Sequence, residues 1–289
     1  MFPRIIRGRS KPGTMEITLG HSPDADDAFM FYGIVSGKVR SGFTVRHVIE
    51  DIETLNRRAL KQELDVTAVS AHAFAYLHDY VILKSGGSFG LNYGPIVIVK
   101  KDNRMTPEQL AKAAIAIPGK MTSANLLLEL AIGKFRKIEM SFESIPDAVD
   151  AGEVDAGLVI HEAQITYDKR KFASALDLGT WWSDETNLPL PLGINVASTR
   201  TMSLKQIKEF SEAFKKSIEY GLNNLDTAVD YAMRFGRGQP KETITKFVKM
   251  YVNRLTVDMG GDGKRAIEKL FELAKEKKII DTNIPVQVF

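Results

Sequence analysis

The sequence predicts an α/β protein built from two lobes of similar design. From residue 16 onward, short apolar runs alternate with segments in which apolar residues have a helical spacing. This order is typical of a sheet with helices on its faces. A faint internal repeat supports it, because "ELDVTAVSAHA" (63–73) aligns with "EVDAGLVIHEA" (153–163). Two copies are too few for a solenoid, so they indicate two lobes.

The first series of elements occupies the N-terminal part of the chain in the order βαβαβα. Ile52, Leu55 and Ala59, for example, have the spacing of one helix face. Strands are expected over 16–20, 43–49 and 65–70, and helices over 26–37, 51–62 and 71–78.

The second series follows a glycine-rich loop. Strands are expected over 94–100, 113–118, 138–142, 154–160 and 195–199, with a helix over 122–133. From Ser203, the expected N-cap, the chain is almost entirely helical in pattern.

The order of the two series predicts that lobe 2 (96–195) is inserted into lobe 1 (15–95 plus 196–289). Two chain crossings then separate the lobes, with a ligand cleft between them. Ligands of α/β sheets bind at the C-terminal ends of strands, and clefts between domains are favoured binding sites. We interpret residues 1–14, which contain four basic residues and no acidic one, as a flexible N-terminal extension.

The composition excludes several classes of function. The 289 residues include no cysteine, which rules out disulfides and thiolate chemistry. The net charge of +3 comes from the basic extension, so the nearly neutral remainder gives no reason to expect a nucleic-acid partner. We find no run of 18 apolar residues for a membrane span and no apolar core of a secretory signal. We therefore expect a cytoplasmic protein.

The segment "PGKMTSANLLLEL" places Thr122 and Ser123 at a helix start. The exposed N–H groups and the dipole of such a helix favour an anion. The alternative is a simple N-cap.

The segment "GLVIHEAQITYD" places His161 directly after a buried strand. A neutral imidazole in a cleft accepts a proton near pH 7, and Glu162 or Asp168 is a candidate to orient it. The alternative is a structural histidine with satisfied hydrogen bonds.

The segment "HSPDADD" (21–27) gathers three carboxylates and an imidazole. It is no EF-hand loop, because the required glycine and the last ligand are absent. A looser metal site with His21 and Asp24 stays open. The simpler interpretation is that Asp24 or Asp26 caps a helix, while Asp27 and Ser22 face a substrate.

Nucleotide and flavin cofactors are not indicated, because no G-x-G-x-x-G opens a helix after a strand, and no nucleophile elbow is present. The segment "TWWSDETNLPLPLG" is either an aromatic wall of the cleft or a packed segment.

Several segments together resemble the 1,4-dihydroxy-6-naphthoate synthases of the futalosine route to menaquinone. The segments span most of the chain in order; they are "SPDADDAFMFYGIVSG", "LDVTAVSAHAF", "PGKMTSANLLLEL", "AGLVIHEAQITY", "LDLGTWWSDETNLPLPLG" and "YVNRLTVDMGGDGKRAI". The resemblance implies the two-lobed, type II fold of periplasmic binding proteins. It also implies a lyase without metal or organic cofactor, which opens cyclic dehypoxanthine futalosine, a small anionic carboxylate, and releases a three-carbon fragment.

The resemblance also assigns roles to residues. His161 would be the proton acceptor, and Thr122 and Ser123 would hold the substrate. The turn after the third strand would line the site through Ala68, Val69 and Ser70.

The chain departs from this family at one segment, "SPDADDAF", where familiar members read closer to "SPCPNDTF". Asp24, Asp26 and Ala28 replace Cys, Asn and Thr there. Two alternative functions stay open at this point. One is a non-catalytic solute-binding protein on the same scaffold, and the other is an enzyme like chorismate dehydratase.

Overall fold

The computed structural model describes residues 5–7, 14–235 and 238–289. Its contacts divide the chain into two compact units. Unit 1 comprises the chain up to Phe89 together with Gly193–Lys264 and Asn283–Phe289, and unit 2 comprises Gly90–Leu192 and Arg265–Thr282. The C-terminal segment 265–282 thus lies in unit 2, whereas the sequence placed it in lobe 1. One reason is a hydrogen bond of 2.6 Å from Lys277 Nζ to the Leu130 carbonyl.

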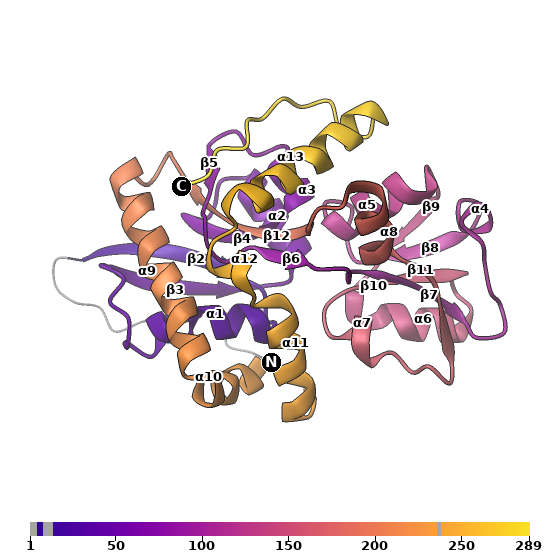
Figure 1. Cartoon of the computed structure of the whole chain (residues 1–289), viewed down its shortest axis with the longest axis horizontal. Helices are drawn as coiled ribbons and strands as arrows, with labels where there is room; N and C mark the ends of the chain where they lie inside the picture. Colours follow the sequence, from indigo (N-terminus) through magenta and orange to yellow (C-terminus); the bar gives the residue numbers. More distant parts are fainter. Residues whose placement is uncertain (1–4, 8–13, 236–237) are drawn as a thin grey trace. The chain divides into compact units, whose positions relative to one another are not determined.

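Unit 1 is built on a mixed sheet with the strand order β1-β3-β2-β4-β12-β5, and β6 pairs with β12 (Figure 1). β2 runs parallel to β3 and β4, whereas β12 is antiparallel to β4 and β5. The strands are β1 (Ile5–Arg7), β2 (Met15–His21), β3 (Phe43–Ile49), β4 (Val66–Ser70), β5 (Tyr80–Ile82), β6 (Ser88–Gly90) and β12 (Leu190–Ser198).

The expected flexible extension contains a strand. Residues 5–7 form β1, which pairs antiparallel with β3 at the edge of the sheet. Thr14 also shares a hydrogen bond of 2.7 Å with the hydroxyl of Thr44. The expectation of flexibility was therefore wrong for these residues, because backbone pairing holds them. The rest of the extension, residues 1–4 and 8–13, lies outside the described residues.

The helices of unit 1 cover this sheet. They are α1 (Ala25–Val35), α2 (Ile52–Leu60), α3 (Ala71–Phe74), α9 (Leu204–Asn223), α10 (Leu225–Ala232), the 3₁₀ turn η2 (Met233–Phe235), α11 (Lys241–Tyr251) and α12 (Arg254–Val257). α13 (Gly260–Glu276) begins in unit 1 and continues in unit 2. No helix in the described ranges has the length and apolar character to cross a membrane.

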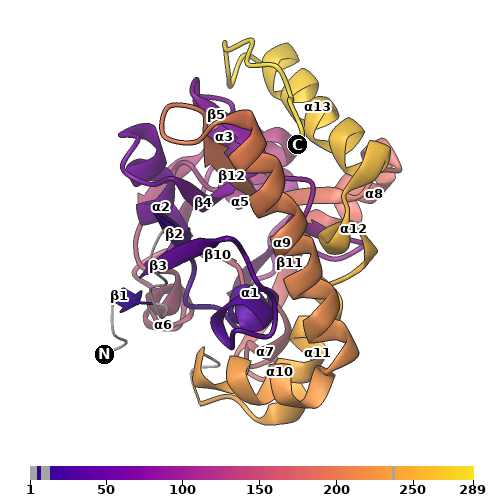
Figure 2. The same cartoon turned by 90° about the vertical axis from the view of Figure 1, so that its left-hand side faces the viewer.

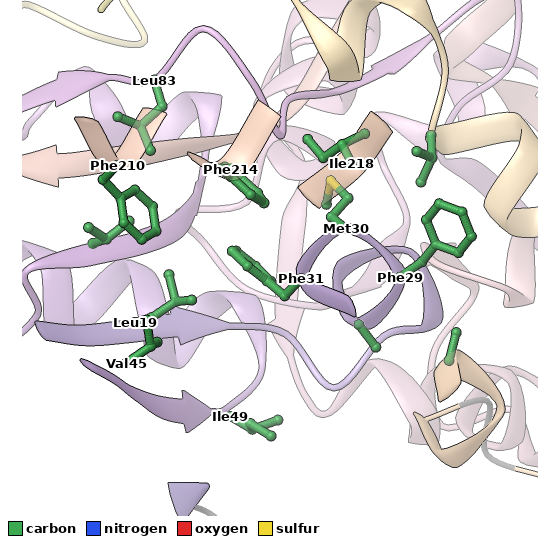
Figure 3. Close-up of a cluster of buried hydrophobic side chains, with 14 of the residues drawn as sticks. Leu19, Phe29, Met30, Phe31, Val45, Ile49, Leu83, Phe210, Phe214 and Ile218 are labelled. Atoms are coloured by element: carbon green, nitrogen blue, oxygen red, sulfur yellow. The ribbon is translucent and has the colours of Figure 1, made fainter. Parts of the chain in front are cut away.

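Helix α1 is buried on nearly all sides because α9 crosses it and α10 and α11 also pack against it (Figures 1 and 2). Gly33 permits the close approach, since a Cβ there would lie 2.9 Å from the Cα of Ser217. The hydroxyl of Ser217 donates to the Met30 carbonyl at 2.7 Å. The rings of Phe31 and Phe214 stack with centroids 4.4 Å apart (Figure 3). This contact joins the sheet, α1 and α9 into one apolar core.

Unit 2 has a five-stranded sheet in the order β11-β7-β10-β8-β9. Its strands are β7 (Ile96–Lys100), β8 (Ala114–Ile117), β9 (Arg136–Glu139), β10 (Ala156–Val159) and β11 (Phe172–Asp177). Its helices are α4 (Pro107–Leu110), α5 (Ser123–Ile132), the 3₁₀ turn η1 (Phe142–Ser144), α6 (Ile145–Ala151), α7 (Ala163–Thr166) and α8 (Leu178–Thr186).

The internal repeat of the sequence corresponds to a repeated topology. The order β3-β2-β4-β12 in unit 1 matches β9-β8-β10-β7 in unit 2, and the last strand is antiparallel in both. Asp65 accepts a hydrogen bond of 2.7 Å from the backbone N–H of Thr18, and Asp155 accepts one of 2.7 Å from Ala114. Asp65, just before β4, therefore bonds to β2, and Asp155, just before β10, bonds to β8 in the same way.

Some elements differ from the sequence-based expectation. The strand expected over 138–142 lies at Arg136–Glu139, because Phe142 already belongs to a 3₁₀ turn. β12 starts five residues earlier than the strand expected over 195–199, through a segment that contains Pro191. Trp182 of α8 is fully buried and donates from Nε1 to the Pro189 carbonyl at 3.0 Å, so it packs inside unit 2.

Candidate functional site

The predicted site residues lie at the C-terminal ends of neighbouring parallel strands in each unit. In unit 1 these strands are β2 and β4, and in unit 2 they are β8 and β10. Ser22, Asp27 and Ser70 belong to the first group. Thr122 and His161 belong to the second. Within each unit the structure therefore brings the predicted residues to one edge of a sheet, which is where ligands bind in such folds.

The residues of "HSPDADD" bond mainly to one another. Ser22 Oγ lies 2.7 Å from Oδ2 of both Asp24 and Asp27, and the Ser22 N–H donates to Asp27 Oδ2 at 2.8 Å. All three side chains are buried. The Ser22 hydroxyl has one proton and two carboxyl neighbours, so a carboxyl proton completes the second contact. Burial raises the pKa of Asp27, which fits a cluster that retains a proton.

Asp24 is the N-cap of α1 by backbone position, but its side chain makes no capping hydrogen bond. Its Oδ2 receives the Ser22 hydroxyl instead. The expectation that Asp24 or Asp26 caps the helix through its side chain was thus wrong for Asp24. The contact of Ser22 and Asp27 with a substrate stays a prediction, since the bonds described here are to each other.

Two of the buried histidines of unit 1, His21 and His47, are neutral and hydrogen-bonded to each other. His21 Nδ1 lies 2.9 Å from the Ser22 carbonyl, so this nitrogen carries the proton. His21 Nε2 therefore accepts from His47 Nδ1 at 3.2 Å. Burial lowers the pKa of His47 to about 3, with a further contribution from His21. Burial likewise lowers the pKa of His21, against the charge of Asp27.

These contacts bear on the metal site that the sequence left open. Both ring nitrogens of His21 are engaged in hydrogen bonds. Within the described ranges, no group of three or more His, Asp or Glu side chains is arranged to hold a metal ion.

Ala68, Val69 and Ser70, expected in the turn after the third strand, are the last three residues of β4 and pair with β12; all three are buried. Ser70 is held by Asn56 of α2, which accepts from the Ser70 N–H at 2.8 Å and donates to Ser70 Oγ at 3.1 Å. Sequence reasoning missed Asn56. The sequence does indicate that Asn56 is buried, because it lies four residues after Ile52 on the apolar face of its helix. A polar residue at such a position needs a buried hydrogen-bond partner.

In unit 2, Thr122 is the N-cap of α5. Its hydroxyl donates to the Gly119 carbonyl at 2.8 Å and accepts from the Asn125 N–H at 3.2 Å. Ser123 Oγ donates to the Leu192 carbonyl at 2.5 Å. The capping interpretation is therefore correct for Thr122. An anion at this helix would bind to backbone N–H groups such as that of Ala124, which have no acceptor within a helix.

Asn125 is a second residue that the sequence analysis missed. Its side chain is buried, and its Nδ2 donates to the Lys120 carbonyl at 2.8 Å. Its Oδ1 has no hydrogen-bond partner among the described residues. Buried acceptors of this kind are rare, so this atom marks the start of α5 as a place to look for a ligand.

His161 follows β10, the central strand of the unit 2 sheet between β7 and β8. Its φ of 55° is left-handed, a strained conformation that occurs often at functional sites. The ring is half-buried and meets Phe142 edge to face with centroids 4.9 Å apart. His161 thus lies half-buried directly after the central strand of the sheet.

The sequence named Asp168 as one candidate to orient this ring. The structure contradicts that, because the Asp168 carboxylate accepts hydrogen bonds of 3.0 Å from both Nε and Nη2 of Arg170. These bonds lower the pKa of Asp168 to about 2. Glu162, the other candidate, is buried beside His161 in the chain.

Comparison with known proteins decides the family of this chain. A family model described as menaquinone biosynthesis matches residues 17–276. The chain belongs to this menaquinone biosynthesis family. A curated member, the 1,4-dihydroxy-6-naphthoate synthase of Thermus thermophilus, is 38% identical over 90% of this chain and 94% of its own length. The resemblance noted from the sequence is thereby confirmed.

Solved structures agree with this membership of the menaquinone biosynthesis family. A crystal structure of an Archaeoglobus fulgidus protein has 47% identity and a TM-score of 0.87, covering 92% of this chain and 98% of that one. The alkanesulfonate-binding protein of Xanthomonas axonopodis pv. citri, bound to MOPS, has a TM-score of 0.71 at 12% identity, covering 97% and 99%. The latter likeness shows the fold, which is that of the periplasmic binding proteins, as predicted.

Proposed function

We propose that this protein is a 1,4-dihydroxy-6-naphthoate synthase with His161 as its general base. The observation that carries the proposal is the 38% identity to the Thermus thermophilus synthase across almost the whole of both chains. The proposal includes finer points, namely the futalosine route, a carbon–carbon lyase reaction, a cytoplasmic location and an anionic carboxylate substrate, cyclic dehypoxanthine futalosine.

The geometry of unit 2 supports the role of His161. The reaction breaks a carbon–carbon bond next to a carbonyl, which begins with removal of a proton. A half-buried imidazole at the end of the central strand is partly exposed to a substrate, and an imidazole is the side chain suited to accept a proton near pH 7. General-base catalysis of this kind typically contributes about 10²- to 10⁴-fold in rate.

The remaining predicted residues are assigned to substrate binding. We propose that the first turn of α5, with Thr122 and Ser123, receives the substrate carboxylate through backbone N–H groups. The Thr122 hydroxyl supports this by fixing the turn. We propose that Ala68, Val69 and Ser70 line the other part of the site.

The experiment is an assay of the purified protein with cyclic dehypoxanthine futalosine, followed by mass spectrometry. The expected product is 1,4-dihydroxy-6-naphthoate. Chorismate is the control substrate, because a dehydratase of the same route would consume it and a synthase would not. Folded protein that yields no naphthoate would refute the proposal.

A further inference from the structure

Two hydrogen bonds between Asn56 and Ser70 fix the direction of a hydroxyl group at the end of β4. Asn56 is fully buried on α2. Its Oδ1 faces the Ser70 N–H at 2.8 Å, and its Nδ2 faces Ser70 Oγ at 3.1 Å. A backbone N–H only donates, so the amide oxygen has to face it and the amide nitrogen has to face the hydroxyl. The partners therefore determine the orientation of the amide.

This orientation determines what the Ser70 hydroxyl offers. Its oxygen accepts the Asn56 proton, so its own proton is directed elsewhere. Among the residues that the structure describes, that proton has no acceptor, and Ser70 makes no capping bond to α3. Ser70 is 3% exposed. A buried donor with a fixed direction binds an oxygen well, and it binds a carboxylate oxygen best.

The strand beside Ser70 leaves room for such an oxygen. Gly193 of β12 pairs with Ser70 across the sheet, so a side chain at 193 would lie on the same face as the Ser70 side chain. A Cβ at Gly193 would meet Ser88 Cβ at 3.8 Å and the Val69 carbonyl oxygen at 3.9 Å, which are ordinary contacts. Packing inside unit 1 thus does not require glycine at this position.

We propose that Asn56 is a positioning residue, which makes the Ser70 hydroxyl a hydrogen-bond donor to a carboxyl or carbonyl oxygen of the substrate in the space beside Gly193. This inference rests on the proposed function, in which Ala68, Val69 and Ser70 at the end of β4 line the substrate site.

Three variants test the direction of the hydrogen bond. Ser70→Ala removes the donor, and KM should rise about 10- to 100-fold with a smaller change in kcat. Asn56→Asp keeps the shape and the acceptor for the Ser70 N–H, but its second oxygen takes the Ser70 proton. KM should rise by a similar factor. The double variant should be no worse than Ser70→Ala, because both changes remove one donor.

The pH dependence of KM separates positioning from structural damage. At low pH the carboxyl introduced by Asn56→Asp is protonated and donates to Ser70 Oγ, which restores the original direction. KM of this variant should therefore fall toward that of the wild type as pH decreases. Ser70→Ala is the control for neighbouring groups that titrate, such as Glu53 and His72, and its KM relative to the wild type should not recover.

Two further variants keep the test decisive if the buried carboxylate of Asn56→Asp prevents folding. Ser70→Cys retains a side chain of similar shape with a weak donor, and its KM should match that of Ser70→Ala. Gly193→Ala should keep the melting temperature of the wild type and raise KM. Retention of wild-type KM by Ser70→Ala in an active enzyme would overturn the inference. Additive increases of KM in the double variant would overturn the inference too. An inactive wild-type protein would instead refute the proposed function.

Discussion

The two units repeat one topology, but the turns after β2 of unit 1 and β10 of unit 2 place polar residues in different environments. After β2, Ser22, Asp24 and Asp27 are buried and bonded to one another. After β10, His161 is half-buried on a left-handed turn. The dense group of charges in the sequence is therefore a buried hydrogen-bonded cluster, whereas His161 is only half-buried.

The difference shows how burial decides the role of a polar residue. Groups that exchange hydrogen bonds within a buried network contribute to the stability of the fold, and burial raises the pKa of a carboxyl such as Asp27. A group that the backbone holds at the surface is free to exchange a proton with a substrate. Variants of the two motifs should accordingly separate stability from catalysis.

The largest expected effect concerns His161. His161→Ala should lower kcat by about 10²- to 10⁴-fold while substrate still binds, since the proposed function gives His161 the role of proton acceptor and not of substrate binding. Turnover and binding are measured separately, by naphthoate production and by calorimetry with substrate. His78→Ala is the matched control, because His78 is exposed in unit 1 and should leave kcat unchanged. Undiminished turnover in His161→Ala would remove this residue from the mechanism.

The buried network of unit 1 should respond in stability. Asp27→Ala leaves the buried N–H of Ser22 without its acceptor and should lower the free energy of unfolding by about 2–3 kcal/mol. Asp27→Asn, the matched control, keeps an amide oxygen at that place and should cost less than about 1 kcal/mol. Urea denaturation measures both values. Equal losses in the two variants would show that the acceptor is unimportant.

The buried histidines predict a loss of stability in mild acid. The folded-state pKa of His47, about 3, lies below the ordinary value of 6.5, so below pH 6.5 the unfolded chain binds a proton that the folded chain does not. The free energy of unfolding should therefore fall by about 2 kcal/mol between pH 7.5 and pH 5. It should fall further toward pH 3.

The control is His47→Gln, whose dependence on pH should be flatter. Asp27 changes the free energy of unfolding in the opposite direction. Because its pKa is raised in the folded state, it stabilises the folded protein at low pH, and this stabilisation is lost as pH rises through the folded-state pKa. It is present in both proteins, so the difference between them isolates His47. Identical slopes would contradict the assignment.

The smallest expected effect is at the start of α5. Thr122→Ala removes the N-cap and should lower the free energy of unfolding by about 1 kcal/mol, whereas Thr122→Ser should preserve most of it. Thermal unfolding measures the loss. A rise in KM in Thr122→Ala beyond that in Thr122→Ser would link the cap to the substrate, and equal melting temperatures would show that the cap contributes nothing.

Much of the fold was predictable because buried strands are continuous apolar runs. The β3 range matches the prediction at both ends, and α5 begins one residue later than expected. β9 was displaced because an edge strand is paired on one side and tolerates charged residues such as Arg136 and Lys137. The start of β12 was missed because Pro191 is unusual inside a strand.

The residues of the candidate site were predictable only where their position in a helix or after a strand could be recognised from neighbouring residues in the sequence. Thr122 at a helix start and His161 after a strand are visible in the sequence. The pairs Asn56–Ser70 and His21–His47 join residues 14 and 26 positions apart, on different elements, so their contacts depend on the packing of helices and strands. The spacing of residues along the chain does not contain that information.

The packing of α1 against α9 also sets an order of events during synthesis. Phe31 is translated early, but its stacking partner Phe214 follows 183 residues later. At synthesis rates of about 5–20 residues per second, roughly 10–40 s separate the two. Most of unit 2 is complete in that interval and is able to fold first, while α1 exposes apolar surface. The nascent chain of this protein is therefore most prone to aggregation just before its last third leaves the ribosome.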